Sequence, residues 1–308
     1  STQSTWDDEA YFRMASLRWK ILRQTVNGRT DVTSDEMKSI SRKHNHGYGL
    51  IPMTRMTKDD EKSPNSGDVN ICYHLPIDGS PKLSIVHRAD SVSDLRDFQI
   101  ANSHNIDNTG IVCHWPSEEV LAYFCLTNVD MFKSKRVLEL GCGYGLAALT
   151  VAASSDASEV VLSDGNPKVL EYAHRNVERN RESFGRTEVR AEMLHWDEEE
   201  APRNLRAFDF IIASDCTFFK DFHKALVRCI RKMLKVDGGS EAVLFSPRRG
   251  DSLEKFLEEM KESGLQFAVD EKYDAKVWER HVRFTSGDAS WPSYESDHCY
   301  PFLIRIKP

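Results

Sequence analysis

The segment RVLELGCGYGLAAL at residues 136–149 limits the possible fold more than any other stretch of the sequence. An apolar run of strand length is followed by glycines in the pattern G-x-G-x-G and then by a second apolar run that is typical of a helix. In α/β folds, a glycine turn between a strand and a helix brings the backbone close to a ligand at the strand's carboxyl end. The segment therefore predicts a ligand site beside Gly141, Gly143 and Gly145.

The spacing of these glycines argues against a dinucleotide as the ligand. The dinucleotide fingerprint is G-x-G-x-x-G, whereas this loop reads G-x-G-x-G and has Glu139 two residues before its first glycine. A carboxylate at that point repels a pyrophosphate but can accept hydrogen bonds from an ammonium group. We therefore expect a zwitterionic or cationic ligand.

From about residue 106 onward, strand-like and helix-like segments alternate. The predicted strands are RVLEL, EVVLSD, TEVRAEML, FDFIIASD, AVLFSP, LQFAVDEKY and PFLIRI. Such alternation is typical of a mostly parallel sheet with helices on both faces. The last two strands are separated by the irregular TSGDASWPSYESDHCYP rather than by a clear helix, so we expect an antiparallel strand at the sheet edge. The predicted fold class for residues 106–308 is therefore α/β and Rossmann-like.

Residues 1–105 have a different pattern and are predicted to form a small α+β accessory region for substrate recognition. Within them, residues 10–30 combine basic residues with an apolar stripe at helical spacing. We expect an amphipathic helix there, whose basic face either contacts an acidic partner or is solvated. After the polar segment TRMTKDDEKSPNSGDV, the runs VNICYHL and KLSIVHR are typical of hairpin strands.

Composition narrows the class of protein. The 308 residues carry a net charge of −7, and residues 1–105 hold 14 acidic and 14 basic side chains, so the whole negative balance falls on residues 106–308. With a pI of about 5.9, the chain lacks the basic footprint of a nucleic-acid-binding protein. The sequence contains no run of 18 apolar residues, so it predicts no membrane span. The first residues lack the apolar core of a secretory signal. The seven cysteines form no C-x-x-C pair, so we expect reduced thiols and no bound metal. Without a predicted signal or membrane span, we expect the protein in the cytoplasm and also the nucleus. We further expect a monomer.

Side chains that follow the predicted strands are expected to meet at one edge of the sheet. Asp164 stands 23 residues beyond Gly141, where an acid can bind the two hydroxyls of a ribose. Trp196 follows the third strand, where a flat indole can stack on an adenine. A zwitterion site, a ribose acid and an adenine platform together predict S-adenosylmethionine. The predicted cofactor-binding residues are Trp115, Glu139, Gly141, Gly143, Gly145, Asp164, Gly165, Asn166, Trp196 and Ser214.

Residues 106–308 also resemble the class I, seven-strand-fold protein lysine methyltransferases. The resemblance lies in a Trp before the glycine loop, the E-x-G-x-G loop, a Trp after the third strand, and D-x-x-F in SDCTFF. Within that family, DNTGIVCHWPSEEVLAYFCL, LSDGNPK, SDCTFF and PRRG are most similar to enzymes that methylate calmodulin, and RWKILRQ extends the likeness into the first region. The resemblance implies S-adenosylmethionine as cofactor, calmodulin as protein substrate, and catalysis by Asp215 and Phe218.

Methyl transfer to a lysine requires that the amine first lose its proton. A free lysine has a pKa near 10.4, so its neutral form at pH 7 is disfavoured by about 4 to 5 kcal/mol. We expect Asp215 to hold and align the incoming ammonium and Phe218 to wall the channel by cation–π contact. Phe stands at 218 where much of the family has Tyr, so this position supplies no hydroxyl. In the alternative, Asp215 caps a helix predicted over residues 218–235.

Two arginines follow the fifth strand. Arg248 and Arg249 are predicted to lie at the rim of the site and to bind the acidic substrate, because the planar guanidinium suits paired carboxylates. In the alternative, they pair with the protein's own acids and organise the loop. Three other functions stay open: a methyltransferase for another protein lysine, one for a small molecule, and a non-catalytic module that binds S-adenosylmethionine.

Overall fold

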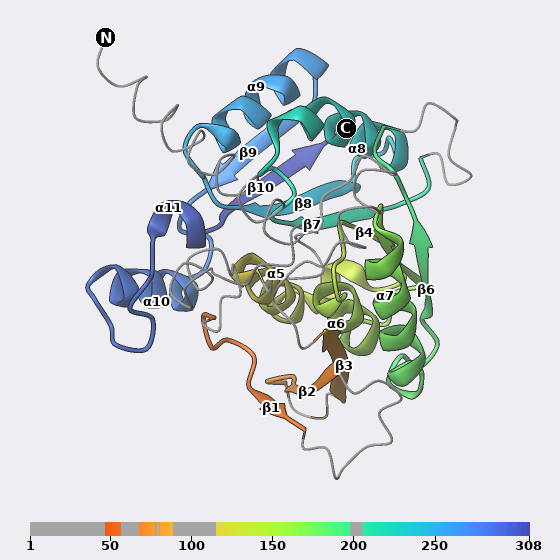
Figure 1. Cartoon of the computed structure of the whole chain (residues 1–308). Helices are drawn as coiled ribbons and strands as arrows, with labels where there is room; N and C mark the ends of the chain where they lie inside the picture. Colours follow the sequence, from red (N-terminus) through yellow and green to blue (C-terminus); the bar gives the residue numbers. More distant parts are fainter. Residues whose placement is uncertain (1–46, 57–67, 78, 80, 89–114, 198–205) are drawn as a thin grey trace, which may run out of the picture. The chain divides into compact units, whose positions relative to one another are not determined.

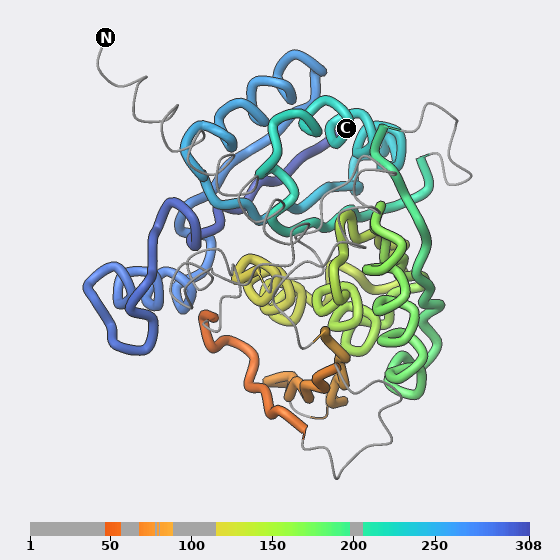
Figure 2. The backbone as a smooth tube through the Cα atoms, viewed as in Figure 1, coloured from red at the N-terminus to blue at the C-terminus, as the bar shows by residue number. Residues whose placement is uncertain are grey.

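The computed structural model describes residues 47–56, 68–77, 79, 81–88, 115–197 and 206–308. All of them belong to one compact unit of the chain, residues 43–308. Figure 1 shows the arrangement of their helices and strands, and Figure 2 the path of the backbone. The basic helix predicted over residues 10–30 lies outside the described residues, and the division at residue 105 stays a prediction.

Seven strands form the main sheet, and each lies where the sequence predicted a strand. They are β4 (Arg136–Leu140), β5 (Glu159–Asp164), β6 (Glu188–Met193), β7 (Phe210–Ser214), β8 (Glu241–Ser246), β9 (Gln266–Asp270) and β10 (Phe302–Lys307). Their order is β6-β5-β4-β7-β8-β10-β9. Strands β4 to β8 pair in parallel, and β10 runs antiparallel between β8 and β9. The predicted α/β sheet with an antiparallel strand at this edge is confirmed.

Helices cover both faces of this sheet (Figure 1). On one face lie α5 (Pro116–Thr127), α6 (Leu146–Ser154) and α7 (Pro167–Arg179), and on the other α8 (His223–Met233) and α9 (Ser252–Ser263). Short 3-10 turns occupy Val129–Phe132 (η2), Arg181–Ser183 (η3) and Lys220–Phe222 (η4). Alternate strand residues point to opposite faces, so Val137 packs with α5 to α7 and Leu138 with α8 and α9.

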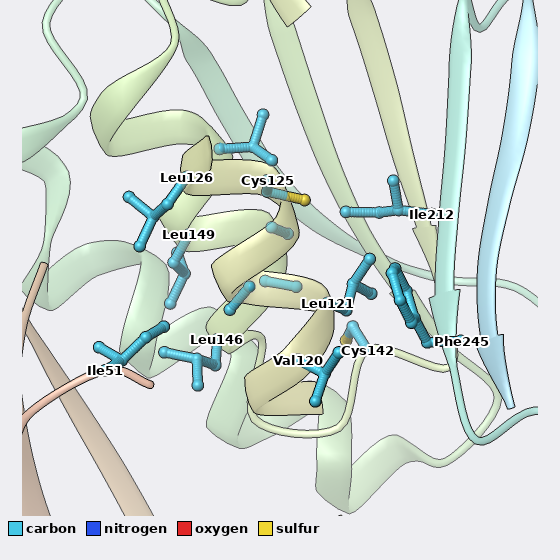
Figure 3. Packing of buried hydrophobic residues seen from close by; sticks show 14 of the residues in the cluster. Ile51, Val120, Leu121, Cys125, Leu126, Cys142, Leu146, Leu149, Ile212 and Phe245 are labelled. Atoms are coloured by element: carbon cyan, nitrogen blue, oxygen red, sulfur yellow. The ribbon is translucent and has the colours of Figure 1, made fainter. Parts of the chain in front are cut away.

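Helix α5 is central to the first of these two cores. Figure 3 shows its apolar side chains between the sheet and α6, in one cluster with buried residues of the glycine loop, α6, β7 and β8. The residues labelled there are Ile51, Val120, Leu121, Cys125, Leu126, Cys142, Leu146, Leu149, Ile212 and Phe245. Because α5 is held on several sides, the residues of its first turn have a fixed place beside the glycine loop.

The connection between β9 and β10 differs from the expectation. It contains the helix α10 (Ala275–Thr285) and the short helix α11 (Ser296–Cys299), where the sequence indicated no clear helix. The Asp274 side chain begins α10 by accepting a hydrogen bond from the backbone N–H of Val277 at 2.9 Å. Among the residues of α10, Val277 and Phe284 are buried, so its apolar stripe was too narrow to be recognised.

A smaller sheet precedes the main one in the sequence. It consists of β1 (Met53–Arg55), β2 (Asp68–His74) and β3 (Lys82–Arg88), antiparallel in the order β1-β2-β3. Strands β2 and β3 confirm the predicted hairpin. Strand β1 was missed because its three exposed residues show no apolar alternation and two of them belong to the segment interpreted as a polar loop. Among the described helices, none has the length and apolar character needed to cross a membrane.

Asn176 in α7 and Asn180, which follows the last residue of that helix, fasten β3 to the main domain; β3 lies beside α7 in Figures 1 and 2. The Asn176 side chain accepts from the backbone N–H of Val86 at 2.8 Å and donates to the Val86 carbonyl at 3.3 Å and the Tyr144 carbonyl at 3.0 Å. Asn180 bonds the N–H and the carbonyl of Ser84 in the same way, both at 2.8 Å. These amides thus satisfy backbone groups at the free edge of β3.

We expect Asn176→Ala to lower the free energy of unfolding by about 2 to 3 kcal/mol, because it leaves buried backbone groups without partners. Urea denaturation would measure the change. The matched control is His174→Ala on the exposed side of the same helix. Equal stability of the two variants would show that the amide contributes little.

Candidate active site

A pocket of about 590 Å³ opens where the carboxyl ends of β4, β5 and β7 meet. Strand order reverses at β4, since β5 lies on one side of it and β7 on the other, and such switch points hold the ligands of open α/β sheets. Residues of β1 to β3 form the opposite wall. Of the predicted site residues, those lining the pocket are Trp115, Gly141, Gly143, Gly145, Asp164, Gly165, Trp196, Ser214, Asp215, Phe218 and Arg249.

Two glycines of the loop are required by space as well as by conformation. Gly141 has a φ of 63°, and a Cβ there would lie 2.9 Å from Cys216 Sγ and 3.6 Å from Trp196 Cζ2. Gly145 has a φ of 84°, and a Cβ there would overlap the side chain of Leu162. Glycine at 141 leaves room beside the Trp196 ring, and glycine at 145 lets α6 pack closely on β5.

The predicted ribose acid and adenine platform both face the pocket. Asp164 ends β5, and its carboxylate accepts hydrogen bonds from the N–H of Gly143 at 3.3 Å and of Asn166 at 2.9 Å. Trp196 follows β6 and meets the ring of Phe222 edge-on at 6.4 Å. Asn166 has a different position: it is buried outside the pocket lining and caps α7 by accepting from the N–H of Lys168 at 3.0 Å.

A carboxyl pair lies under the loop, and one of its members was missed by the sequence analysis. Glu139 is 1% exposed and does not line the pocket; its carboxylate accepts from the N–H of Ala148 at 3.1 Å. Glu118, from the first turn of α5, does line the pocket and accepts from Ser214 Oγ at 2.5 Å and the N–H of Ala147 at 2.8 Å. Acids in a first helical turn usually only interact with the helix dipole, so no local pattern signalled this role.

Burial raises the pKa of Glu118 above its ordinary value. The pKa of Glu139 is raised still further, first by burial and then by the neighbouring charge of Glu118. Two adjacent carboxyls, one buried and one half-buried, favour sharing a proton, and a cation in the pocket beside Glu118 would favour release of that proton. This end of the pocket therefore suits a ligand with an ammonium group.

The raised pKa of Glu139 predicts a pH dependence of stability. The folded protein retains a proton at pH values where the unfolded chain has lost it, so this group's contribution falls as pH rises from the ordinary pKa of 4.5 toward the folded pKa. Glu139→Gln should flatten that decline. Urea denaturation of the cofactor-free protein at several pH values would measure it, with the exposed Glu171→Gln as control. An unchanged slope in Glu139→Gln would contradict the assignment.

The other end of the pocket carries an acid, aromatic rings and an arginine. Asp215 follows β7, and Oδ1 of its carboxylate lies 2.5 Å from Nη2 of Arg249. The Arg249 guanidinium lies 4.4 Å from the ring centroid of Trp115 and 5.0 Å from that of Phe218. Burial raises the pKa of Asp215, and the Arg249 guanidinium opposes this rise. Asp215 does not cap α8, because that helix begins at His223, after the η4 turn.

The structure places the two predicted rim arginines in different surroundings. The prediction that Arg249 lies at the rim is wrong, because its side chain is 5% exposed and pairs with Asp215 inside the pocket wall. Arg248 is exposed, pairs with Glu254 at 3.1 Å and lies over the ring of Phe302. Each thus pairs with an acid of this chain, as in the alternative given above. Arg249 has a positive φ, and its backbone N–H bonds to the carbonyl of Asp297; local spacing reveals neither feature.

Comparisons with known proteins agree with this geometry. Residues 94–263 match a protein family described as lysine methyltransferase. The chain belongs to this family. It is 54% identical to calmodulin-lysine N-methyltransferase of Arabidopsis thaliana over 95% of this chain and 96% of the relative. It is also 28% identical to protein N-lysine methyltransferase METTL21A of Danio rerio, over 64% of this chain and 87% of the relative. It is 27% identical to protein-lysine N-methyltransferase EEF2KMT of Homo sapiens, over 76% of this chain and 69% of the relative.

The residues of this lysine methyltransferase fit S-adenosylmethionine as its cofactor. Gly141 leaves open the space beside Trp196, where an adenine can stack. The Asp164 carboxylate lines the same wall and can accept from ribose hydroxyls. Glu118 provides a half-buried carboxyl for the amino group of the methionine part. Asp164 and Trp196 follow β5 and β6, whereas Asp215 follows β7, so the part of the pocket at the Asp215–Arg249 pair, the acceptor end, is left for the substrate.

Proposed function

We propose that this enzyme transfers methyl groups from S-adenosylmethionine to a lysine side chain of calmodulin. The observation that carries the proposal is the 54% identity to a calmodulin-lysine N-methyltransferase over 95% of this chain. That likeness extends well before residue 94, where the match to the family begins. It therefore includes the region expected to recognise the substrate.

The acceptor end of the pocket supports a lysine substrate. When bound, S-adenosylmethionine supplies a methyl carbon that an amine lone pair can attack while the carbon–sulfur bond breaks. Trp115 and Phe218 provide aromatic surface for the lysine stem, and both rings already contact the Arg249 guanidinium. Asp215 and Arg249 are held in the wall between these rings. Such walls exclude water and orient the amine, which favours transfer by positioning.

The proposal is tested with purified enzyme, methyl-labelled S-adenosylmethionine and recombinant calmodulin that has never been methylated. We expect label on a calmodulin lysine, located by mass spectrometry, and none on calmodulin whose lysines have been acetylated. Lysate treated with RNase or with protease extends the assay. Label in other proteins but not in calmodulin would indicate another protein lysine, and label that survives protease would indicate a small molecule.

Arg248 is the exposed member of the predicted substrate-binding pair, with a side chain 55% accessible. If it contacts acidic calmodulin, Arg248→Glu should raise the KM for calmodulin by about tenfold, and more at low salt, because charges at an interface act through screened attraction. Cofactor affinity should not change. Wild-type kinetics across a salt series would place recognition elsewhere, with the predicted helix at residues 10–30 as the next candidate.

We also propose that the enzyme acts as a monomer in the cytoplasm and the nucleus, without a nucleic-acid partner. The cysteines of the described residues are free thiols, four of them buried, which suits a reducing compartment. Light scattering of the purified protein would test the monomer, and fractionation of cells that express the tagged full chain would test the location.

A further inference from the structure

The acceptor end of the pocket already holds a cation that belongs to the protein. The Arg249 guanidinium lies over the rings of both Trp115 and Phe218 and beside the carboxylate of Asp215, with side-chain exposures of 5% for the arginine and 3% for the acid. Both residues have positive φ, 47° and 56°, which is a costly conformation for side chains other than glycine. The fold therefore maintains this pair against local strain.

Contacts of its backbone keep Arg249 in place. Its N–H donates to the carbonyl of Asp297 at 2.9 Å, and the next N–H, of Gly250, donates to the Asp297 carboxylate at 2.8 Å. The guanidinium adds a longer bond of 3.4 Å to the carbonyl of His298. Moving Arg249 out would leave Asp215 as a buried charge without its partner, which is unfavourable. We infer that the arginine stays when a substrate enters.

The other groups around the pair add little fixed charge. From α5, Ser117 and Glu118 face Asp215; Glu118 is the acid assigned above to the ammonium group of the cofactor, and that group would balance its charge. Cys216 follows Asp215 and Cys299 lies in α11, and burial raises the pKa of both thiols. His298 of α11 also faces Asp215, but its side chain is 55% exposed and pairs with Glu295. The dominant charges are those of Asp215 and Arg249, which cancel.

This balance has a consequence for a lysine that enters the site. An arginine is always charged, so a lysine ammonium beside the pair meets a like charge as well as the acid. A neutral amine carries no charge for the arginine to repel. We propose that Arg249 is a positioning residue that cancels the charge of Asp215 and so makes the acceptor site bind the substrate lysine as its neutral, nucleophilic amine. The inference rests on the lysine methyltransferase function proposed above, and it replaces the sequence-based role of Asp215 as the holder of an ammonium.

The pH profile of kcat at saturating calmodulin tests this inference, because kcat reports ionisations in the substrate complex. Arg249→Gln leaves the negative charge of Asp215, so the midpoint should move to higher pH by about one unit or more, and Asp215→Asn should move it to lower pH by a similar amount. Arg249→Lys keeps the charge and should stay near the wild-type midpoint. The matched control is Arg283→Gln, which removes an ion-paired arginine of α10.

Calorimetry gives a second readout that does not depend on turnover. Calmodulin is titrated into enzyme saturated with S-adenosylhomocysteine, in buffers with different ionisation heats, at a pH where free lysine is charged. Wild-type enzyme should release about one proton per bound calmodulin, because the lysine enters neutral. The Arg249→Gln enzyme should release fewer protons. Its affinity for S-adenosylhomocysteine shows whether its pocket is intact.

Several outcomes would overturn the inference. Faster transfer at neutral pH in Arg249→Gln would show that the arginine blocks the acceptor site until the substrate displaces it. Equal losses at every pH, without a midpoint shift, would make it structural. Disappearance of the pH dependence in Asp215→Asn would show that the wild-type profile reports Asp215 itself. Wild-type enzyme that neither binds nor methylates calmodulin would instead contradict the proposed function.

Discussion

Asp215→Ala is expected to abolish methyl transfer and to destabilise the fold together. Transfer should fall by about a hundredfold or more, because the acceptor site loses its orienting acid. The free energy of unfolding should fall by about 3 to 5 kcal/mol, because Arg249 is left as an uncompensated charge in a wall where its side chain is 5% exposed. Affinity for S-adenosylmethionine should stay near that of the wild type, since the predicted ribose and adenine contacts, Asp164 and Trp196, follow other strands, β5 and β6.

A double-mutant cycle separates the two effects. Asp215→Ala combined with Arg249→Met removes both charges and keeps much of the side-chain volume, so stability should recover while transfer does not. Urea denaturation and a methyl-transfer assay at saturating cofactor would measure the two quantities. If Asp215→Ala weakens cofactor binding as much as transfer, the residue belongs to the cofactor half; if its stability equals the wild type's, the ion pair contributes little.

Asp164→Ala should weaken S-adenosylmethionine binding by about 2 to 4 kcal/mol, which is roughly 30- to 1,000-fold in Kd. The carboxylate lines the pocket at the end of β5, and its oxygens can accept from two ribose hydroxyls. The variant also removes its bonds to the N–H groups of Gly143 and Asn166, so the loop itself becomes less ordered.

The matched control for that loop effect is Asp164→Asn, which keeps an acceptor for the turn but loses the negative charge. Calorimetry with S-adenosylmethionine would give the two affinities, and calmodulin binding should change in neither variant. Wild-type affinity in Asp164→Ala would overturn the ribose assignment. An equal loss in both variants would indicate that the charge, rather than the order of the loop, dominates.

Local sequence patterns were sufficient for the framework of the cofactor half. Strands β4 and β5 follow from apolar runs of the right length, and Gly141 and Gly145 from the steric needs of a tight strand-to-helix turn. Asp164 could be predicted because residues after parallel strands meet at one edge of a sheet. Where the pattern was weak, as in the exposed β1 and the narrow stripe of α10, elements were missed.

Contacts between distant segments could not be predicted from spacing. Glu118 lies on α5 and meets Ser214, 96 residues further along, only because α5 packs across β7 and β8. Similarly, Asn176 reaches β3 from 90 residues away. A single sequence shows each of these polar residues as an ordinary exposed side chain, because nothing local signals that it will be buried.

The sequence by itself therefore determined the α/β framework, the glycine loop and the acids at the strand ends, since these depend on the period of apolar residues and on sterics within a few positions. Only the tertiary structure decided which charges share the pocket. It placed Glu118 beside the buried Glu139 and turned Arg249 inward onto Asp215. The physical reason is that the energy of a charge depends on its desolvation and its neighbours, and both are set by packing between segments far apart in the chain.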